Sequence, residues 1–173
     1  MNSQPIKASS AKGLRAKIVE QMPGIEPFIE EIWPKKAKVY QMRFKGENQI
    51  TFIVIEDQIM FLELNHRNIM PMLKLLHKYP MILPHMVCDK GAIRHIFSGS
   101  DVMAPGLTSE GGNIDLSVPE GGAVAIMAEG KVHAMGVGLM KQSGEDVKAT
   151  GKGVAIESIQ FLNDQLWKEV YPN

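Results

Sequence analysis

The first forty residues carry apolar side chains at the spacing of two short helices. Over residues 14–22 every fourth side chain is apolar, so these side chains would share one helix face. Ser9 or Ser10 precedes that face, and a serine hydroxyl there would accept a hydrogen bond from a free amide of the first turn. A Pro-Gly pair at 23–24 ends this predicted helix, and helical spacing resumes over residues 25–33.

Three β-type segments follow, over residues 37–44, 50–55 and 58–64. They are rich in β-branched and aromatic side chains, which favour strands. Only Glu56 and Asp57 separate the second segment from the third, a spacing typical of a tight hairpin. The pattern therefore predicts a strand-rich region with at least one hairpin.

A third helix is predicted to begin at Pro71 and to end at Pro80. Proline suits the first turn of a helix because the amide it lacks would have no partner there. One face of this helix is apolar and consists of Met72, Leu75, Leu76 and Tyr79. The opposite face, which we expect to be exposed, carries Lys74, His77 and Lys78.

The pattern changes at Asp89. This residue is placed to cap a short helix, and Gly99 stands where a helix often ends in a left-handed residue. The predicted core side chains of this helix are Ala92, Ile93, Ile96 and Phe97. Lys90 and Arg94 lie one turn apart on its outer face.

Glycine and proline are frequent over residues 105–122, which predicts a loop. Two apolar segments, 123–128 and 132–140, follow as a predicted hairpin that is rich in alanine and glycine. Ser143 begins another short helical turn, and 154–161 is the last predicted strand. Strands with such small side chains fit a small closed barrel, because the interior of a small barrel is crowded.

The charge distribution indicates a division of the chain after residue 88. Residues 1–88 contain 12 Lys and Arg and 8 Asp and Glu, whereas residues 89–173 contain 7 and 11. We therefore predict an α+β protein of two domains, 1–88 and 89–173. A basic half beside an acidic half indicates contact with RNA by one part and with a protein partner by the other. The alternative is ordinary surface charge that maintains solubility.

The composition excludes several classes of protein. Hydrophobic residues make up 45% of the chain and charged residues 22%, which excludes disordered and fibrous proteins. Cys88 is the single cysteine, so no disulfide can form within the chain. No apolar run reaches the roughly 18 residues of a membrane span, and the first residues lack the apolar core of a signal peptide. We therefore expect a soluble protein of the cytoplasm with no membrane contact.

The sequence contains no recognisable catalytic signature. It has no Gly-x-x-x-x-Gly-Lys-Ser/Thr phosphate loop and no Gly-x-Ser-x-Gly nucleophile elbow. The five histidines are scattered, and His85 with Cys88 supplies fewer ligands than a zinc site needs. We therefore predict no enzymatic activity, no metal and no cofactor.

Basic side chains in the first half could contact phosphates. We expect a phosphate-facing patch of Lys35, Lys36, Lys38, Arg43, Lys45, Lys74, His77 and Lys78. The alternative is a solvated lysine-rich rim. Aromatic residues make up only 6% of the chain, so stacking on bases is a weak expectation, and recognition of folded RNA by its shape and backbone fits better.

The segment from Asp89 to Gly106 resembles the opening helix, turn and strand of a PUA domain, a small RNA-binding pseudobarrel. Further PUA-like segments follow in order at 125–130, 136–140, 143–146, 151–154 and 163–167. We expect a PUA-type RNA-contacting edge formed by Lys90, Gly91, Arg94, Ser98, Gly99, Ser100, Pro105 and Gly106. Glycine inside a helix costs about 1 kcal/mol relative to alanine. Close approach of RNA would explain Gly91; the alternative is tight packing of the helix on a strand.

Over residues 10–170 the chain resembles the malignant T-cell-amplified sequence protein family. The segments that carry this resemblance are 21–27, 34–36, 75–80, 82–85 and 105–109. The resemblance implies a small N-terminal α+β domain packed on a C-terminal PUA pseudobarrel. It also implies a non-enzymatic translation factor that binds rRNA of the small ribosomal subunit and acts in initiation, reinitiation and post-termination release of tRNA. The partner implied is density-regulated protein, which carries a SUI-type domain.

Two other functions are compatible with a PUA domain. The first is an adaptor in ribosome biogenesis or rRNA processing, which would use the same RNA-binding unit. The second is an RNA-modifying enzyme, but such enzymes carry a separate catalytic domain. The residues before the PUA-like segment contain no signature of one, so we set the enzyme aside.

Overall fold

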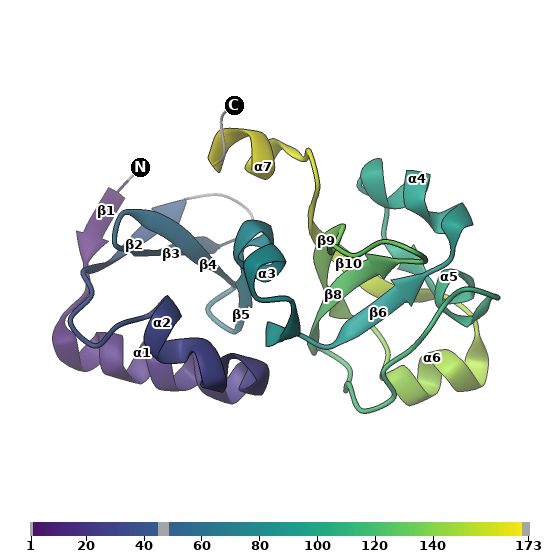
Figure 1. Cartoon of the computed structure of the whole chain (residues 1–173), viewed down its shortest axis with the longest axis horizontal. Helices are drawn as coiled ribbons and strands as arrows, with labels where there is room; N and C mark the ends of the chain where they lie inside the picture. Colours follow the sequence, from purple (N-terminus) through teal and green to yellow (C-terminus); the bar gives the residue numbers. More distant parts are fainter. Residues whose placement is uncertain (1, 45–48, 171–173) are drawn as a thin grey trace. The chain divides into compact units, whose positions relative to one another are not determined.

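The structure, a computed structural model, describes residues 2–44 and 49–170. The chain divides into two compact units, Met1–Leu75 and Leu76–Asn173. Each unit is built around its own sheet of five strands, and the two sheets can be followed in Figure 1. No helix within the described ranges is long and apolar enough to cross a membrane.

The first unit is an antiparallel sheet with α1 and α2 along the same side (Figure 1). Its strands are β1 (Asn2–Pro5), β2 (Val39–Phe44), β3 (Ile50–Ile55), β4 (Gln58–Leu64) and β5 (Asn68–Pro71). Each strand pairs with the next one in the chain. The helical segments are α1 (Ala8–Gln21), the 3-10 helix η1 (Pro23–Phe28) and α2 (Ile29–Ile32).

The predicted hairpin is confirmed between β3 and β4. Residues 51–55 of the central strand β3 are all buried, so side chains on both faces of this strand are covered. Glu56 and Asp57 have φ angles of 46° and 65°, the left-handed backbone that a two-residue turn between twisted strands requires. The β-branched residues of β3 therefore lie at the centre of the first core.

Two helix starts differ from the sequence prediction. Helix α1 begins at Ala8 after Lys7, and no side chain caps its first turn, so Ser9 and Ser10 lie inside the helix. Pro71 ends strand β5, where it lies opposite Phe61, and α3 (Leu73–Lys78) begins two residues later. Both errors have the same cause, because serine and proline fit the first helical turn and the adjoining extended segment alike. The apolar face predicted for α3 is confirmed as buried.

The second unit is a mixed sheet with short helices. Its strands are β6 (His85–Cys88), β7 (Val102–Met103), β8 (Ala123–Ala128), β9 (Gly136–Met140) and β10 (Val154–Phe161). The spatial order is β6-β8-β9-β10-β7, with β6 parallel to β8 and the other pairs antiparallel. The helical segments are η2 (Pro80–Ile82), η3 (Lys90–Ala92), α4 (Ile93–Phe97), α5 (Ala104–Thr108), α6 (Gly144–Thr150) and α7 (Gln165–Val170).

Glycine permits the close approach of β9 and β10. A Cβ atom at Gly136 would lie 2.5 Å from the carbonyl oxygen of Gln160, and one at Gly138 would lie 2.6 Å from that of Glu157. Both distances are shorter than real Cβ contacts. The glycines therefore let β9 and β10 lie close together. In the described residues the sheet order begins at β6 and ends at β7, which do not pair, so the closed barrel predicted from the small side chains is not formed.

The structure divides the chain earlier than the charge pattern does. Strand β6, residues 85–88, pairs with β8 over its whole length, from His85 opposite Ala125 to Cys88 opposite Ala128. These residues therefore belong to the second sheet, and a division after residue 88 would cut between this strand and the rest of its unit. The reversal of charge at this point falls inside the second unit, because surface charge does not determine which strands pair.

The segment around Asp89 matches its prediction only in part. The Asp89 carboxylate accepts a hydrogen bond of 2.9 Å from the Ala92 amide, so the predicted cap is confirmed. Ile96 is buried, but the Phe97 side chain is 43% exposed and is not a core residue.

The predicted loop over 105–122 was wrong at its start, where α5 forms with Pro105 in its first turn.

Candidate nucleic-acid interface

The second unit contains a cleft between α4 and α5, which we call the α4–α5 cleft. Its volume is about 610 Å³. It is lined by Asp89, Gly91, Ala92, His95, Ile96, Ser100, Asp101, Val102, Met103, Pro105, Gly106, Ser109 and Val154. Because these residues lie on η3, α4, β7, α5, the turns that join them and the start of β10, the cleft exists only when the second unit is folded.

Backbone contacts hold the two sides of the α4–α5 cleft together. The amide of Asp89 donates to the carbonyl of Gly106 at 2.9 Å, which links the start of η3 to α5. A Cβ atom at Gly106 would lie 3.4 Å from the Cβ of Ala92, which is an ordinary contact distance, so α5 and η3 lie side by side here.

The turn after α4 is fixed by hydrogen bonds. The Ser98 hydroxyl donates to the carbonyl of His95 at 2.7 Å, and the Ser100 amide donates to the same carbonyl at 3.1 Å. Gly99 has a φ of +86°, and a Cβ atom there would lie 3.2 Å from the ring of Phe161. The left-handed glycine predicted from the sequence is confirmed.

The structure brings four of the eight residues predicted for the RNA-contacting edge together around the α4–α5 cleft. Gly91, Ser100, Pro105 and Gly106 line the α4–α5 cleft. The other predicted residues, Lys90, Arg94, Ser98 and Gly99, are exposed on η3, α4 and the turn after it but do not line the cleft.

Gly91 does not pack on a strand. The atom nearest to a Cβ built at Gly91 is the Asp89 Oδ1, at 3.4 Å, and the residue is exposed. It also lies in the 3-10 segment η3 rather than inside an α-helix. The packing alternative weighed in the sequence is therefore wrong, and the backbone of Gly91 is open to an approaching ligand.

Sequence reasoning missed His95, Asp101, Met103 and Ser109 in this lining. The Asp101 carboxylate accepts a hydrogen bond of 3.0 Å from the Ser158 amide, which gives it a structural role. Met103 is 49% exposed, an unusual fraction for a large apolar side chain beside a cleft. Spacing alone could not find Met103, because the pairing of β7 with β10 brings it into place.

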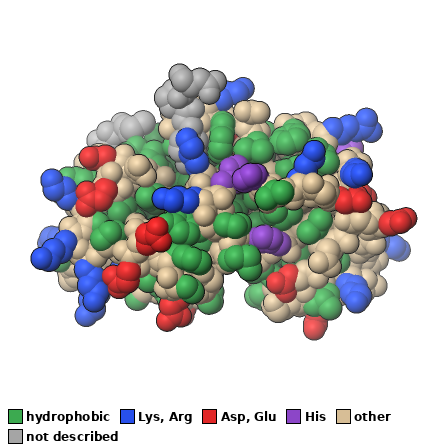
Figure 2. Space-filling model, in the orientation of Figure 1, with side chains coloured by type: hydrophobic (Ala, Val, Ile, Leu, Met, Phe, Trp, Pro, Cys, Tyr) green, Lys and Arg blue, Asp and Glu red, His purple; other side chains and the backbone are tan. Residues whose placement is uncertain are grey.

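The first unit contains a second cavity, which we call the basic pocket. Its volume is about 680 Å³. Its basic lining residues are Lys12, Arg15, Lys35, Lys36 and Lys38. The remaining lining residues are Pro5, Ile6, Ala8, Ala11, Trp33, Ala37, Val39 and Tyr40. In Figure 2, Lys and Arg side chains stand along the left margin of this unit, with Asp and Glu side chains beside them.

Backbone hydrogen bonds hold the lysine-bearing segment of the basic pocket in place. The Ala37 amide donates to the carbonyl of Pro34 at 3.0 Å, and the Ile6 amide donates to the carbonyl of Val39 at 3.0 Å. The Lys38 amide donates to the Glu56 carboxylate at 3.0 Å. The segment is therefore anchored both to the end of β1 and to the β3–β4 turn.

Arg15 is the one basic lining residue with an ion pair recorded in the described part of the chain. Its Nη2 lies 2.8 Å from Glu30 Oε1. The hydrogen bond from Arg15 lowers the pKa of Glu30 below its ordinary value, and the charge of Lys35 acts in the same direction. Glu30 does not line the pocket.

The remaining residues of the predicted basic patch lie elsewhere. Arg43 is exposed on β2, and Lys74 and Lys78 are exposed on α3, but none of the three lines the basic pocket. Lys45 lies outside the described residues. The sequence therefore found the 35–38 cluster but missed Lys12 and Arg15, which α1 contributes.

His77 does not belong to an exposed basic face. Its ring is half-buried, and Nε2 donates to the carbonyl of Ala134 at 2.7 Å. The rings of His133 and Trp167 lie 5.3 and 5.8 Å away. Burial lowers the pKa of His77, against the opposing effect of the hydrogen bond to Ala134. The exposure predicted for His77 was therefore wrong.

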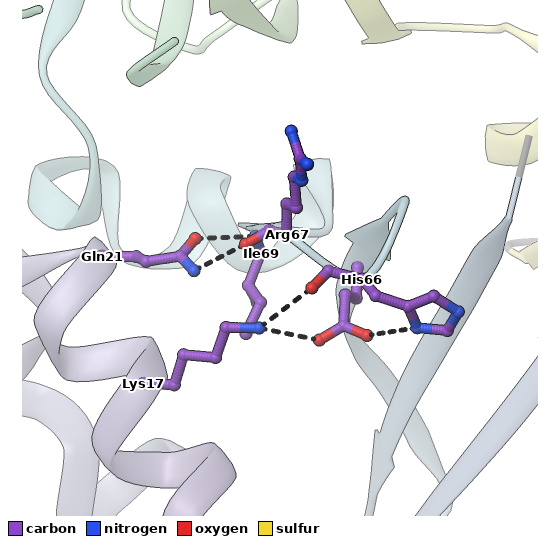
Figure 3. Close-up of polar contacts among 6 residues, drawn as sticks. Lys17, Gln21, His66, Arg67 and Ile69 are labelled. Carbon is purple, nitrogen blue, oxygen red and sulfur yellow. Dashed lines mark hydrogen bonds and ion pairs between the residues drawn. The ribbon is translucent and has the colours of Figure 1, made fainter.

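A group of side chains that the sequence did not reveal fixes the turn between β4 and β5, and we call it the α1 clasp (Figure 3). Gln21 Nε2 donates to the carbonyl of Arg67 at 2.7 Å, and Gln21 Oε1 accepts from the Ile69 amide at 2.9 Å. Lys17 lies 3.5 Å from the buried carboxylate of Glu63. The clasp therefore joins the last turns of α1 to the edge of the sheet.

The described residues offer little to metal or thiol chemistry. No group of three or more His, Cys, Asp and Glu in the described ranges could hold a metal ion. Cys88 is buried, and this burial, reinforced by the charge of Asp89, raises its pKa to about 12.

Known families match both units. A Pre-PUA-like domain matches residues 1–80, and a PUA domain matches residues 84–162. The chain is also similar in fold to a hypothetical protein from Pyrococcus horikoshii, with a TM-score of 0.80 and 24% identity over 98% of this chain and 100% of that one. A PUA domain protein from Thermoplasma acidophilum has a TM-score of 0.70 and 22% identity over the same shares. The predicted α+β fold with a PUA unit is confirmed.

Curated relatives span nearly the whole chain. Malignant T-cell-amplified sequence 1 of Rattus norvegicus is 44% identical over 96% of this chain and 90% of that protein. Malignant T-cell-amplified sequence 2 of Homo sapiens is 43% identical over the same shares. Translation machinery-associated protein 20 of Schizosaccharomyces pombe is 36% identical over 96% of this chain and 91% of that protein. The chain therefore belongs to the malignant T-cell-amplified sequence family.

Proposed function

We propose that the chain is a non-enzymatic RNA-binding translation factor that acts on the small ribosomal subunit in the cytoplasm. The observation that carries this proposal is its similarity, over 96% of its length, to a relative named for its association with the translation machinery. The PUA domain supplies the RNA-binding unit. The family resemblance extends the proposal to initiation, reinitiation and tRNA release after termination, with density-regulated protein as the partner.

The RNA-contacting surface proposed for the second unit is the α4–α5 cleft with the basic edge beside it. Lys90 and Arg94 supply the positive charge, and the open backbone at Gly91 lets a strand approach closely. Residues 89–173 carry 11 acidic against 7 basic side chains. Because this half of the chain has no general excess of positive charge, removal of Lys90 and Arg94 should weaken RNA binding strongly.

The first unit adds phosphate contacts in this proposal. The residues proposed for them are Lys35, Lys36, Lys38, Arg43, Lys74 and Lys78. All six are exposed, so their replacement should leave the fold intact.

Co-sedimentation with purified small ribosomal subunits across a range of salt concentrations tests the proposal. The Lys90→Ala/Arg94→Ala variant should bind more weakly, and its salt dependence should fall by roughly one unit for each phosphate that the variant no longer neutralises. The matched control is Lys148→Ala/Lys168→Ala, which removes two exposed charges of the same unit that lie outside the cleft.

Three outcomes count against the proposal. Unchanged affinity and salt dependence in Lys90→Ala/Arg94→Ala reject the edge. Failure of the wild-type protein to bind small subunits, with or without density-regulated protein, rejects the function. Enrichment on pre-ribosomal particles instead favours an adaptor in ribosome biogenesis.

A further inference from the structure

We propose that the basic pocket of the first unit binds an unpaired nucleotide of an RNA strand. In this arrangement its lysine rim holds the phosphates and its Tyr40 wall contacts the base. The inference rests on the proposed function, because it names the RNA feature that this unit recognises.

The lining of the basic pocket carries positive charge and no negative charge, and Glu30 beside it pairs with Arg15. Its 13 residues include five basic side chains and no acidic one. Arg15 is paired with Glu30, whereas no ion pair is recorded within the described chain for the four lysines. Lysine ammonium groups on flexible stems bind phosphate as point charges and adapt to its position. The four lysines can therefore adjust to the positions of the phosphates in a bound RNA strand.

The shape of the basic pocket selects an unpaired strand over a duplex. The cavity is a concave pocket open to solvent on one side and bordered by α1, by the end of β1 and by residues 33–40, and its volume of about 680 Å³ lies in the range of small-ligand sites. An A-form duplex is a convex cylinder and can touch only the rim of such a cavity. A nucleotide that is splayed out of a single strand can enter it.

The floor and wall of the basic pocket suit a base. Ala8 and Ala11 present only methyl groups to the cavity, so α1 leaves room there. Tyr40 lines the cavity and is half-buried as a residue, whereas Trp33 is 97% buried and is held in the core. A base stacked on one aromatic ring binds with little dependence on its identity. We therefore expect this unit to bind unpaired RNA with weak sequence preference.

Tyr40 distinguishes a nucleotide from an acidic peptide. Both ligands would contact the lysine rim. Only a base gains binding free energy by stacking on the Tyr40 ring, because stacking requires a π-face. A leucine at this position offers no such face. The low aromatic content of the chain led us to expect recognition of RNA by its shape and backbone. One aromatic residue in a basic cavity is nevertheless sufficient to stack on one base.

Fluorescence anisotropy with three probes tests the inference. The probes are a short single-stranded RNA, a short RNA duplex and an acidic peptide of similar net charge. Tyr40→Leu should weaken binding of the single strand by about tenfold and leave the peptide unchanged. Tyr40→Phe, which keeps the ring, should restore wild-type affinity. Lys35→Ala/Lys36→Ala should lower the salt dependence of single-strand binding by about 1.4 units, at about 0.7 unit per phosphate contact, whereas Lys148→Ala/Lys168→Ala should not.

The outcomes separate this inference from the proposed function. If the pocket variants bind single strands normally while Lys90→Ala/Arg94→Ala loses small subunits, the inference fails and the function stands. If the pocket variants lose the acidic peptide but not the RNA, the basic pocket is a protein interface and the inference fails. If wild-type protein binds neither RNA nor small subunits, the proposed function fails. Thermal melting of each variant separates loss of binding from loss of folding.

Discussion

A single added methyl group at Gly138 should destabilise the second unit. The new Cβ would lie 2.6 Å from the Glu157 carbonyl oxygen, 3.3 Å from Ile126 Cδ1 and even closer to Ile156 Cγ2. Overpacking a core usually costs about 1–3 kcal/mol. Because a backbone carbonyl in a paired strand cannot rotate away, we expect Gly138→Ala to reach the upper end, about 3 kcal/mol. For a unit of about a hundred residues this lowers the melting temperature by more than about 10 °C.

Calorimetry of Gly138→Ala beside Gly91→Ala tests this reasoning. The control makes the same substitution in the same unit, where the nearest atom to the new Cβ is Asp89 Oδ1 at 3.4 Å. Gly91→Ala should therefore change the free energy of unfolding by no more than about 0.5 kcal/mol. If Gly138→Ala melts at the same temperature as the wild type and as Gly91→Ala, the claim that β9 and β10 require glycine where they meet is refuted.

Three further results are expected. His77, whose pKa is lowered by burial from an ordinary value of 6.5, binds a proton more readily when the chain is unfolded, so stability should fall as pH drops through 6.5. His77→Gln should lose that dependence; equal pH profiles of melting temperature for both proteins would contradict it. Cys88, with a pKa of about 12, should resist iodoacetamide at pH 8 until the protein unfolds, and rapid native labelling would show that the thiol is accessible. Gln21→Ala should cost about 1–3 kcal/mol in urea unfolding because the Ile69 amide loses its acceptor, whereas Glu20→Ala, exposed on the same helix, should cost little; similar losses for the two would argue against the α1 clasp.

Elements with strong local signals could be predicted from the sequence. The strand at 50–55 has β-branched and aromatic side chains throughout, and the cap at Asp89 depends only on residues three positions apart. Strand β1 carried no such signal, because Asn2–Pro5 is polar and forms a strand by pairing with β2. Helix α5 was not predicted because Pro105 and Gly106 are typical of loops, although proline also suits a first helical turn.

The candidate sites needed long-range pairing that no local pattern contains. Lys12 and Lys36 are far apart in the chain and line one cavity because the end of β1 bonds to the start of β2. Met103 reaches the α4–α5 cleft through the pairing of β7 with Val154 of β10. The charge count pointed to a basic first half, but only the fold separates the pocket lysines from Arg43 and Lys74.

The two sheet topologies imply a defined order of events as the chain leaves the ribosome. In the first sheet each strand pairs with its immediate successor, so the whole sheet can form once Pro71 has emerged. In the second sheet, β7 cannot pair until β10 has been synthesised. Strand β6 cannot pair until β8 has been synthesised, after an intervening segment that contains η3, α4 and α5. Such non-local pairing is slow, because loop closure must precede any gain from the pairing itself. During synthesis the first unit therefore folds early, while the second exposes the unpaired edge of β9 until residues 154–161 arrive. A nascent chain stalled before β10 would present that edge for aggregation, and chaperones would recognise it at this stage.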